Sequence, residues 1–229
     1  GAAGACIPLG GVLARVEHIR PRWLEDELRH FVIAFGGGIL LAAVALVLVP
    51  EGVAYLSSAV DAVLFFMGGG LFFFWLERLL GLRKRESPQF SAMLLDYIPE
   101  SLALGGIFAV GSGSALLLAL FIGLQNLPEG FNAFREMNAV KEARPNRIIL
   151  LMCALVPLGP VFGTLGWLFF AQDTWFLGTV MLFASGGILY LVFQDIAPQS
   201  RLQRHWAPPL GAVAGFSVGI LGQVWLQHV

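Results

Sequence analysis

The chain has 229 residues, of which 57% are hydrophobic and only 13% are charged, and its net charge is −1. A soluble domain is typically about 25% charged, so these charges cannot cover a globular surface. The composition excludes a soluble enzyme, a disordered protein and a disulfide scaffold. It indicates a helical membrane protein, because the apolar runs are long and do not alternate as the strands of a membrane barrel do.

The apolar runs predict an all-α, polytopic membrane protein with eight transmembrane helices in a single transmembrane domain over residues 1–229. The predicted spans are residues 1–15, 30–50, 59–80, 90–110, 114–134, 148–171, 175–198 and 209–226. Gly1–Leu13 is too short to cross a membrane alone and lacks a basic leader. We interpret it as the end of a truncated or short first span and not as a signal peptide.

The basic residues predict the orientation. All 14 lysines and arginines fall in or beside the links between spans one and two, three and four, five and six, and seven and eight. By the positive-inside rule these links are cytoplasmic. An even number of spans then places both termini outside. We therefore expect an integral, multi-pass protein of the plasma (inner) membrane.

Two motifs recur in spans that run in opposite directions. Residues 37–50 and 186–198 each begin with Gly-Gly and end with proline, and residues 98–101 and 127–130 each contain Pro-Glu. Paired motifs in oppositely directed spans indicate inverted repeats. Interrupted helices in such repeats usually mark the midplane site of a transporter.

Three carboxylates lie well inside the predicted spans. Asp96 and Glu100 are in span four, and Glu129 is in span five. An acidic side chain at the centre of a membrane helix costs about 2.5–3.5 kcal/mol on insertion scales. No lysine, arginine or histidine lies deep in a span to pair with these acids. The compensating charge must come from protons, a metal ion or both.

Helical geometry favours one shared site. Asp96 and Glu100 are four residues apart and share a helix face, as do Gln125 and Glu129. Counted from the cytoplasmic ends of two antiparallel spans at about 1.5 Å per residue, Asp96 is level with Glu129 and Glu100 is level with Gln125. We expect these four oxygen-bearing side chains to converge.

The motifs resemble those of the zinc/iron permease (ZIP) family of divalent-metal transporters, which has eight spans and both ends outside. Residues 96–101 and 125–130 take the places of the two metal-binding motifs, Pro50-Glu51 that of the Pro-Glu closing span two, and residues 157–159 that of Pro-Leu-Gly in span six. Residues 186–199 are similar to the family's Gly-Gly…His-Glu-x-x-Pro-Glu segment.

The resemblance implies that Asp96, Glu100, Gln125 and Glu129 hold a metal ion, with Asn126 as a further candidate ligand. It also implies a pathway that begins at Glu51, where the ion would enter, and ends at Gln194 and Asp195, where the ion would reach the cytoplasm.

The chain departs from the family at the metal-site histidine, which is Asp96, and at two ligands of a second metal site, which are Tyr97 and Val156. We therefore expect one transport site and not a two-metal cluster. Three carboxylates and an amide suit Mn²⁺ or Fe²⁺ better than a site that selects Zn²⁺.

The sequence thus predicts a ZIP-like transporter that imports Mn-, Fe- or Zn-type ions into the cytoplasm. A proton-coupled carrier or channel that uses the same acids stays open, as does a degenerate, non-transporting ZIP-like protein. The spans hold no His-Glu-x-x-His helix and no Ser/His or Cys/His pair, so we do not expect an enzyme. We expect no cofactor.

The expected partners are a divalent metal ion as substrate and the lipid bilayer, and we expect no nucleic acid. The aromatic residues of Phe72–Trp75 are expected to face lipid or a partner subunit. A homodimer therefore stays open.

Overall fold

The computed structural model describes the chain except for residues 18–21, 81–87, 141–143, 202–205 and 228–229. Every regular element in the described part is a helix. The elements are α1 (Ala2–Val16), α2 (Arg22–Ala43), η1 (Val44–Leu48), α3 (Val49–Tyr55), α4 (Ala59–Leu80), α5 (Pro88–Ala109), α6 (Ser114–Asn138), α7 (Pro145–Leu155), α8 (Leu158–Phe170), α9 (Thr174–Leu191), η3 (Val192–Ile196), α10 (Ala197–Gln199) and α11 (Leu210–Gln227).

The helices are long and apolar enough for a membrane. Six helical stretches meet the length and composition needed to cross one. They are Asp26–Tyr55, Ala59–Leu79, Ala92–Ala109, Ser114–Asn138, Pro145–Phe170 and Thr174–Gln199. Ala2–Val16 and Leu210–Leu226 are shorter apolar helices. The fold is therefore all-helical over the described residues and compatible with an integral, multi-pass membrane protein.

Each predicted span has a helical counterpart, but one of them consists of two helices and not one. Span six was expected to be one helix over residues 148–171. The structure divides it into α7 and α8, because Val156 and Pro157 form a turn between them. Proline lacks the N–H that would continue the hydrogen-bond ladder, and its ring clashes with the preceding turn.

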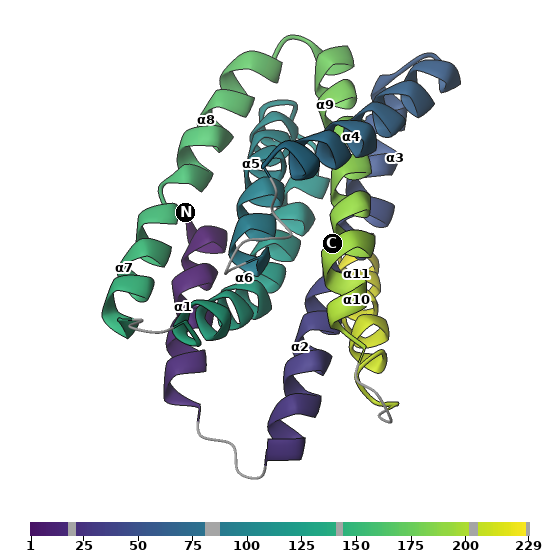
Figure 1. The fold of residues 1–229 in the computed structure, drawn as a ribbon. Helices are drawn as coiled ribbons and strands as arrows, with labels where there is room; N and C mark the ends of the chain where they lie inside the picture. The colour runs from purple at the N-terminus through teal and green to yellow at the C-terminus, as the bar shows by residue number, and fades with distance from the viewer. Residues whose placement is uncertain (18–21, 81–87, 141–143, 202–205, 228–229) are drawn as a thin grey trace.

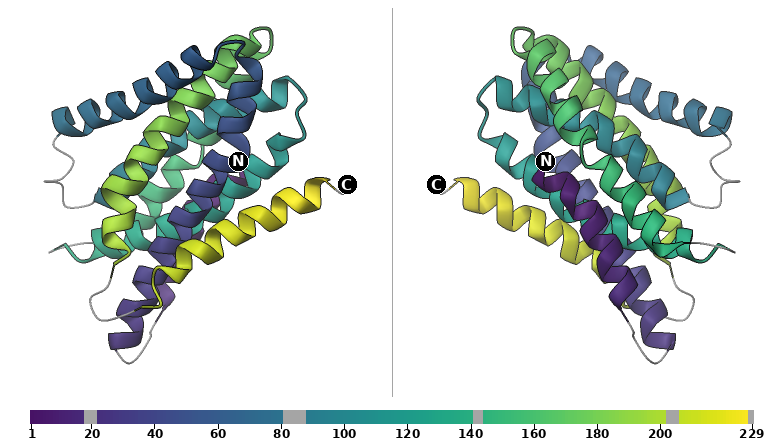
Figure 2. Two further views of the ribbon diagram at one scale, coloured as in Figure 1. Left: turned by 90° about the vertical axis from the view of Figure 1, so that its right-hand side faces the viewer. Right: turned by 90° about the vertical axis from the view of Figure 1, so that its left-hand side faces the viewer.

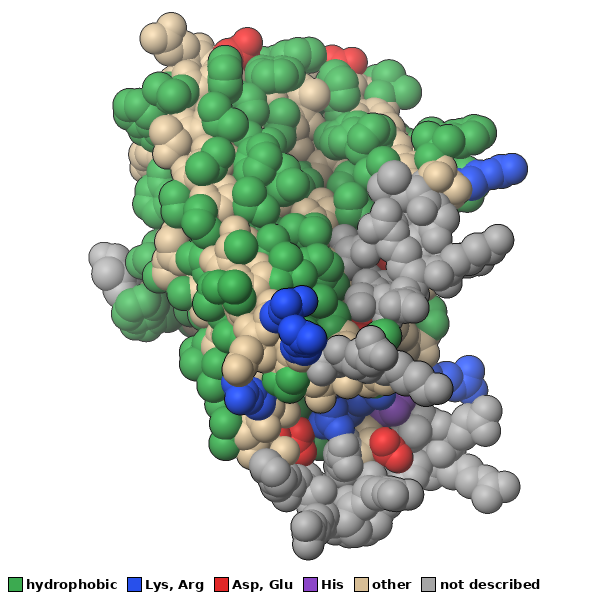
Figure 3. All heavy atoms as spheres, turned by 60° about the vertical axis from the view of Figure 1, so that its left-hand side comes forward, with side chains coloured by type: hydrophobic (Ala, Val, Ile, Leu, Met, Phe, Trp, Pro, Cys, Tyr) green, Lys and Arg blue, Asp and Glu red, His purple; other side chains and the backbone are tan. Residues whose placement is uncertain are grey.

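The core lies around α2, α5, α6 and α9. Between 56% and 67% of the residues in the apolar windows of these helices are buried, against 17% for the windows of α4 and of α7–α8. Figure 1 shows α5 and α6 in the interior of the bundle, whereas Figure 2 shows α4 and α11 projecting to opposite sides of it. On the face drawn in Figure 3, apolar side chains cover most of the surface, and most of the visible Lys and Arg side chains lie near the lower end.

Glycines let helices cross backbone against backbone. A Cβ atom at Gly69 of α4 would lie 1.9 Å from the carbonyl oxygen of Phe183 in α9. One at Gly38 of α2 would lie 2.1 Å from the carbonyl oxygen of Ala212 in α11. Small residues at such crossings are what bring helices together in lipid, where no hydrophobic force acts between them.

The two Gly-Gly…Pro segments share a local irregularity. The turn of π-helix in η1 ends two residues before Pro50, and the turn in η3 ends two residues before Pro198. Proline disturbs the helical turn that precedes it, and a π turn absorbs one additional residue there. Two oppositely directed helices therefore widen at matching places.

We expect Gly69→Ala to cost about 1–3 kcal/mol of stability, because the added methyl group meets backbone that cannot move aside cheaply. Gly68→Ala is the matched control, because no atom lies within 4 Å of a Cβ atom at that position. Thermal unfolding in detergent, followed by circular dichroism, measures the difference. Equal melting temperatures for the two variants would contradict this crossing.

Candidate functional site

Neighbouring helices α5 and α6 carry the four side chains that the sequence selects. Asp96 and Glu100 come from α5, and Gln125 and Glu129 come from α6. All four are buried, with exposed fractions of 3%, 0%, 0% and 6% in that order. These two helices thus hold three carboxyl groups and an amide in the interior, and none of the four side chains lies on the surface of the protein.

One hydrogen bond joins the two helices at the centre of this group. The Nε2 atom of Gln125 donates to Oε2 of Glu100 over 2.6 Å. The expected pairing of Glu100 with Gln125 is therefore present. Asp96 interacts electrostatically with Glu129 and Glu100, and Glu129 interacts with Glu100. The three acids belong to one cluster.

Several oxygens of this cluster have no hydrogen-bond donor. They are Oδ1 of Asp96, Oε1 of Glu100, Oε1 of Gln125 and both carboxylate oxygens of Glu129. A buried polar atom without a partner costs about 1–3 kcal/mol, and more when it is charged. Five such atoms in one place form a strong acceptor for protons or for a cation.

Among the described residues, no whole Lys, Arg or His side chain is buried, although the Nε atom of Arg29 in α2 is. In the described part of the chain, the buried charged side chains are Glu77, Asp96, Glu100 and Glu129, all of them acidic. In the cluster of Asp96, Glu100 and Glu129, a cation or protons would balance the negative charge, because an uncompensated charge is costly in a protein interior.

The acids are close but do not yet enclose an ion. Within residues 1–17, 22–80, 88–140, 144–201 and 206–227, no three side chains among His, Cys, Asp and Glu come together tightly enough to hold a metal. The amide of Gln125 donates a hydrogen bond to Glu100 and so occupies one of its carboxylate oxygens. A divalent ion would have to draw the donors inward.

Prolines beside the acids interrupt both hydrogen-bond ladders. Pro99 and Pro128 lie inside α5 and α6. Because proline has no N–H, the carbonyl groups of Leu95 and Leu124 receive no i→i−4 bond. Carbonyl groups freed in this way are additional oxygen ligands when they line a cavity.

Asn126 and Tyr97 contact helices outside the cluster. The Nδ2 atom of Asn126 donates to the carbonyl oxygen of Ala3 in α1 over 3.0 Å. The hydroxyl of Tyr97 lies so close to Gly4 in α1 and Gly159 in α8 that a Cβ atom at either glycine would be 2.2 Å from it. Tyr97 therefore fills the space between α1, α5 and α8.

Glu51, which the resemblance places at the entry of the pathway, is hydrogen-bonded to the turn between α5 and α6. Glu51 accepts hydrogen bonds from the hydroxyl groups of Ser112, over 2.9 Å, and of Ser114. These bonds join α3 to the tight turn between α5 and α6, where Gly111 has a φ of 71°. That positive φ favours glycine.

Near the opposite end, Gln194 contacts an acid that the sequence analysis missed. Its Nε2 atom donates to Oε1 of Glu77 over 3.1 Å, and the hydroxyl of Tyr190 also donates to Glu77. Glu77 looks like a charge at the end of a span, because basic residues follow it. Gly69, Phe73 and Glu77 follow one another at intervals of four residues, so they share one face of α4, and this face is buried. This spacing could have identified Glu77 as a buried acid.

Asn132 was also missed. It is 1% exposed, its Nδ2 atom donates to the carbonyl oxygen of Pro128 over 2.9 Å, and its Oδ1 atom has no donor. It follows Gln125 by seven residues and Glu129 by three, so helical periodicity puts all three on one face of α6. This spacing was the available signal.

A scan against known protein families finds no match for the chain, and a search of curated protein sequences finds none either. The resemblance to the ZIP family rests on the motifs and their order.

We expect Glu100→Gln to stabilise the metal-free protein by about 1–3 kcal/mol, because it removes one of three buried carboxylates and keeps the shape of the side chain. Thermal unfolding in the presence of a chelator provides the measurement. Asp26→Asn is the control, since Asp26 is exposed. A melting temperature that falls or stays constant for Glu100→Gln would contradict the view that burial of three carboxyl groups destabilises the metal-free protein.

Proposed function

We propose that the protein is a ZIP-like transporter of divalent metal ions, with its transport site between α5 and α6. The observation that carries this proposal is the buried cluster of Asp96, Glu100 and Glu129, which has unpartnered oxygens and no buried basic side chain in the described part of the chain. A mobile cation with two charges is one counterion that would balance such a cluster.

The donor set favours hard cations. Carboxylate and amide oxygens, with backbone carbonyl groups nearby, suit Mn²⁺ and Fe²⁺, whereas selection of Zn²⁺ relies on imidazole or thiolate ligands. Affinity for Zn²⁺ still exceeds affinity for Mn²⁺ at many oxygen sites, by the Irving–Williams order. The proposal is therefore a broad or shifted selectivity and not an exclusion of zinc.

The arrangement of helices supports alternating access. The four most extensive helix pairs are α1 with α6, α5 with α8, α2 with α11, and α4 with α9. These pairs fall into two equivalent sets. The pair α1 with α6 corresponds to α8 with α5, and the pair α2 with α11 corresponds to α9 with α4. Together with the matching π turns, this pattern is typical of an inverted repeat, in which one bundle rocks against the other around a central site.

In the proposed direction, the ion enters near Glu51 and moves to the cytoplasm, the side on which the basic links would lie. Proton release would accompany binding, because the carboxyl groups must be ionised to hold the ion. The direction and the eight-span topology follow from the resemblance and from the distribution of basic residues.

A proton-coupled carrier or channel is the second candidate. The bond between Gln125 and Glu100, together with the separated acids, describes a cluster that protons alone could neutralise. Such a protein would bind no divalent ion at neutral pH. A degenerate, non-transporting protein would keep the acids but show no metal flux.

Uptake of Mn²⁺, Fe²⁺ and Zn²⁺ into proteoliposomes tests the proposal. We expect Glu100→Gln and Glu129→Gln to lower uptake by more than about ten-fold, since each removes a ligand, and Asp26→Asn to leave it unchanged. Mn²⁺ should also raise the melting temperature of the native chain more than that of Glu100→Gln.

Strict selectivity for zinc would contradict the proposed donor chemistry. Absence of divalent-ion binding would favour the proton-coupled alternative, and binding without flux would favour the non-transporting one.

A further inference from the structure

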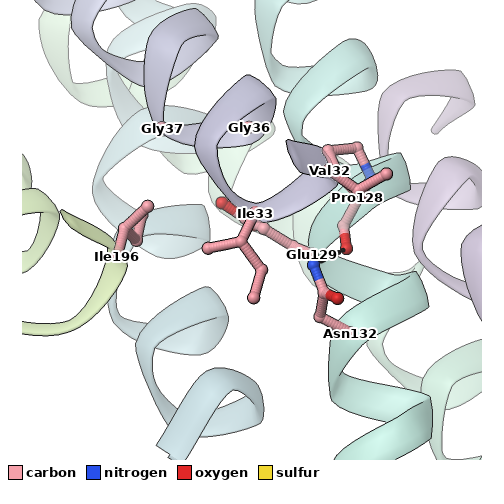
Figure 4. Close-up of a pocket in the computed structure, with 8 residues that line it drawn as sticks. All are labelled: Val32, Ile33, Gly36, Gly37, Pro128, Glu129, Asn132 and Ile196. Carbon is pink, nitrogen blue, oxygen red and sulfur yellow. Dashed lines mark hydrogen bonds between the residues drawn. The ribbon is translucent and has the colours of Figure 1, made fainter. Parts of the chain in front are cut away.

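A small pocket opens beside Glu129, between α2, α6 and η3 (Figure 4). Its walls are Val32, Ile33, Gly36 and Gly37 from α2, Pro128, Glu129 and Asn132 from α6, and Ile196 from η3. Of the four side chains in the cluster, Glu129 alone lines this pocket. The pocket is therefore a direct continuation of the proposed transport site.

The order of residues along α6 shows toward which end of the helix the pocket extends. Asn132 is three residues closer than Glu129 to Arg135 and the basic end of α6, which corresponds to about 4.5 Å along the helix axis. Beyond it, Arg135 pairs with Glu17 over 2.8 Å at that end. The pocket thus lies between the acids and the side that the basic links define.

Asn132 supplies a ligand atom at this place. The amide nitrogen is already used by the carbonyl group of Pro128, whereas the buried Oδ1 atom has no donor. An amide oxygen is a hard, neutral ligand that Mn²⁺ and similar ions accept.

Two isoleucines narrow the pocket. Ile33 and Ile196 are both buried, and the Cγ2 atom of Ile196 would be 2.7 Å from a Cβ atom at Gly37. Ile196 therefore lies directly against the backbone of α2. It is also the last residue of the π turn η3, and a π turn rotates the side chains that follow it around the helix axis.

We propose that the ion leaves the cluster through this pocket, passing from Glu129 to the Oδ1 atom of Asn132, and that Ile33 and Ile196 close the route in this conformation. The inference rests on the proposed function and changes its last step. Gln194, which the resemblance places on the exit, is bonded to Glu77 on α4. The exit then follows the α2 side of η3 and not the α4 side.

Uptake by three variants tests the role of the oxygen. Asn132→Leu removes Oδ1 at similar size and should lower Mn²⁺ uptake by about ten-fold. Asn132→Asp keeps the oxygen but loses the amide bond to Pro128, and it should retain most of the uptake. If only the bond to the carbonyl group matters, both variants fail alike and the proposal is overturned.

Glu129→Gln distinguishes a failure of the exit route from a failure of the proposed function. Loss of uptake in Glu129→Gln with full uptake in Asn132→Leu would overturn the exit route alone. Unchanged uptake in Glu129→Gln would overturn the proposed function as well.

Cysteine labelling tests the route itself. In a background with Cys6→Ala and Cys153→Ala, a hydrophilic thiol reagent applied from the basic side should modify Asn132→Cys. Mn²⁺ should slow this reaction several-fold, and adding Glu129→Gln should abolish the protection. Gln194→Cys, on the side of η3 that contacts Glu77 of α4, should react at the same rate with and without Mn²⁺. Protection of Gln194→Cys with none at Asn132→Cys would place the exit on the α4 side and overturn the proposal.

Discussion

The three carboxyl groups buried between α5 and α6, with no basic side chain buried beside them in the described residues, are the constraint on which the remaining structure depends. Asp96, Glu100 and Glu129 are buried together, and a single amide, that of Gln125, donates to one of them. Coulomb repulsion in a medium of low dielectric constant is strong. A chain that keeps such a cluster needs rigid helices to hold it and a positive partner to neutralise it.

The rigid helices are secured by close crossings. A Cβ atom at Gly130, next to Glu129, would lie 2.2 Å from the carbonyl oxygen of Ile7 in α1, and one at Gly105 of α5 would lie 1.9 Å from that of Gly163 in α8. Each site helix is thus fixed against an outer helix through backbone contact. The acids sit where α5 and α6, held in this way, meet.

Much of the site could be predicted from the sequence, because the interior of a membrane protein tolerates few ionisable groups. An acid far inside an apolar run identifies itself, and the rise of a helix sets its depth. The pairing of Glu100 with Gln125 followed from these two facts alone. Most helices also agree with the predicted spans to within a few residues, since length and hydropathy determine them. The exceptions are α2, which begins at Arg22 and not at residue 30, and span six, which is divided into α7 and α8.

Other residues were hidden for physical reasons. Glu77 adjoins a basic link, so its position suggests a hydrated charge, and only the packing of α4 against α9 buries it. Asn132 is neutral and carries no penalty large enough to stand out. Pro99 and Pro128 lie inside continuous helices, whereas Val156 and Pro157 form a turn, so the presence of a proline does not by itself predict a break. Ile196 lies at the end of a π turn that no residue pattern specifies.

The wedge formed by Tyr97 closes one flank of the acids. Its aromatic ring is buried and occupies the space between α1, α5 and α8, with its hydroxyl close to Gly4 and Gly159. An approach to the three carboxyl groups from that flank would first require the ring to move. The pocket beside Glu129 lies instead against α2. The packing of one aromatic side chain thus limits the directions from which the buried acids can be reached.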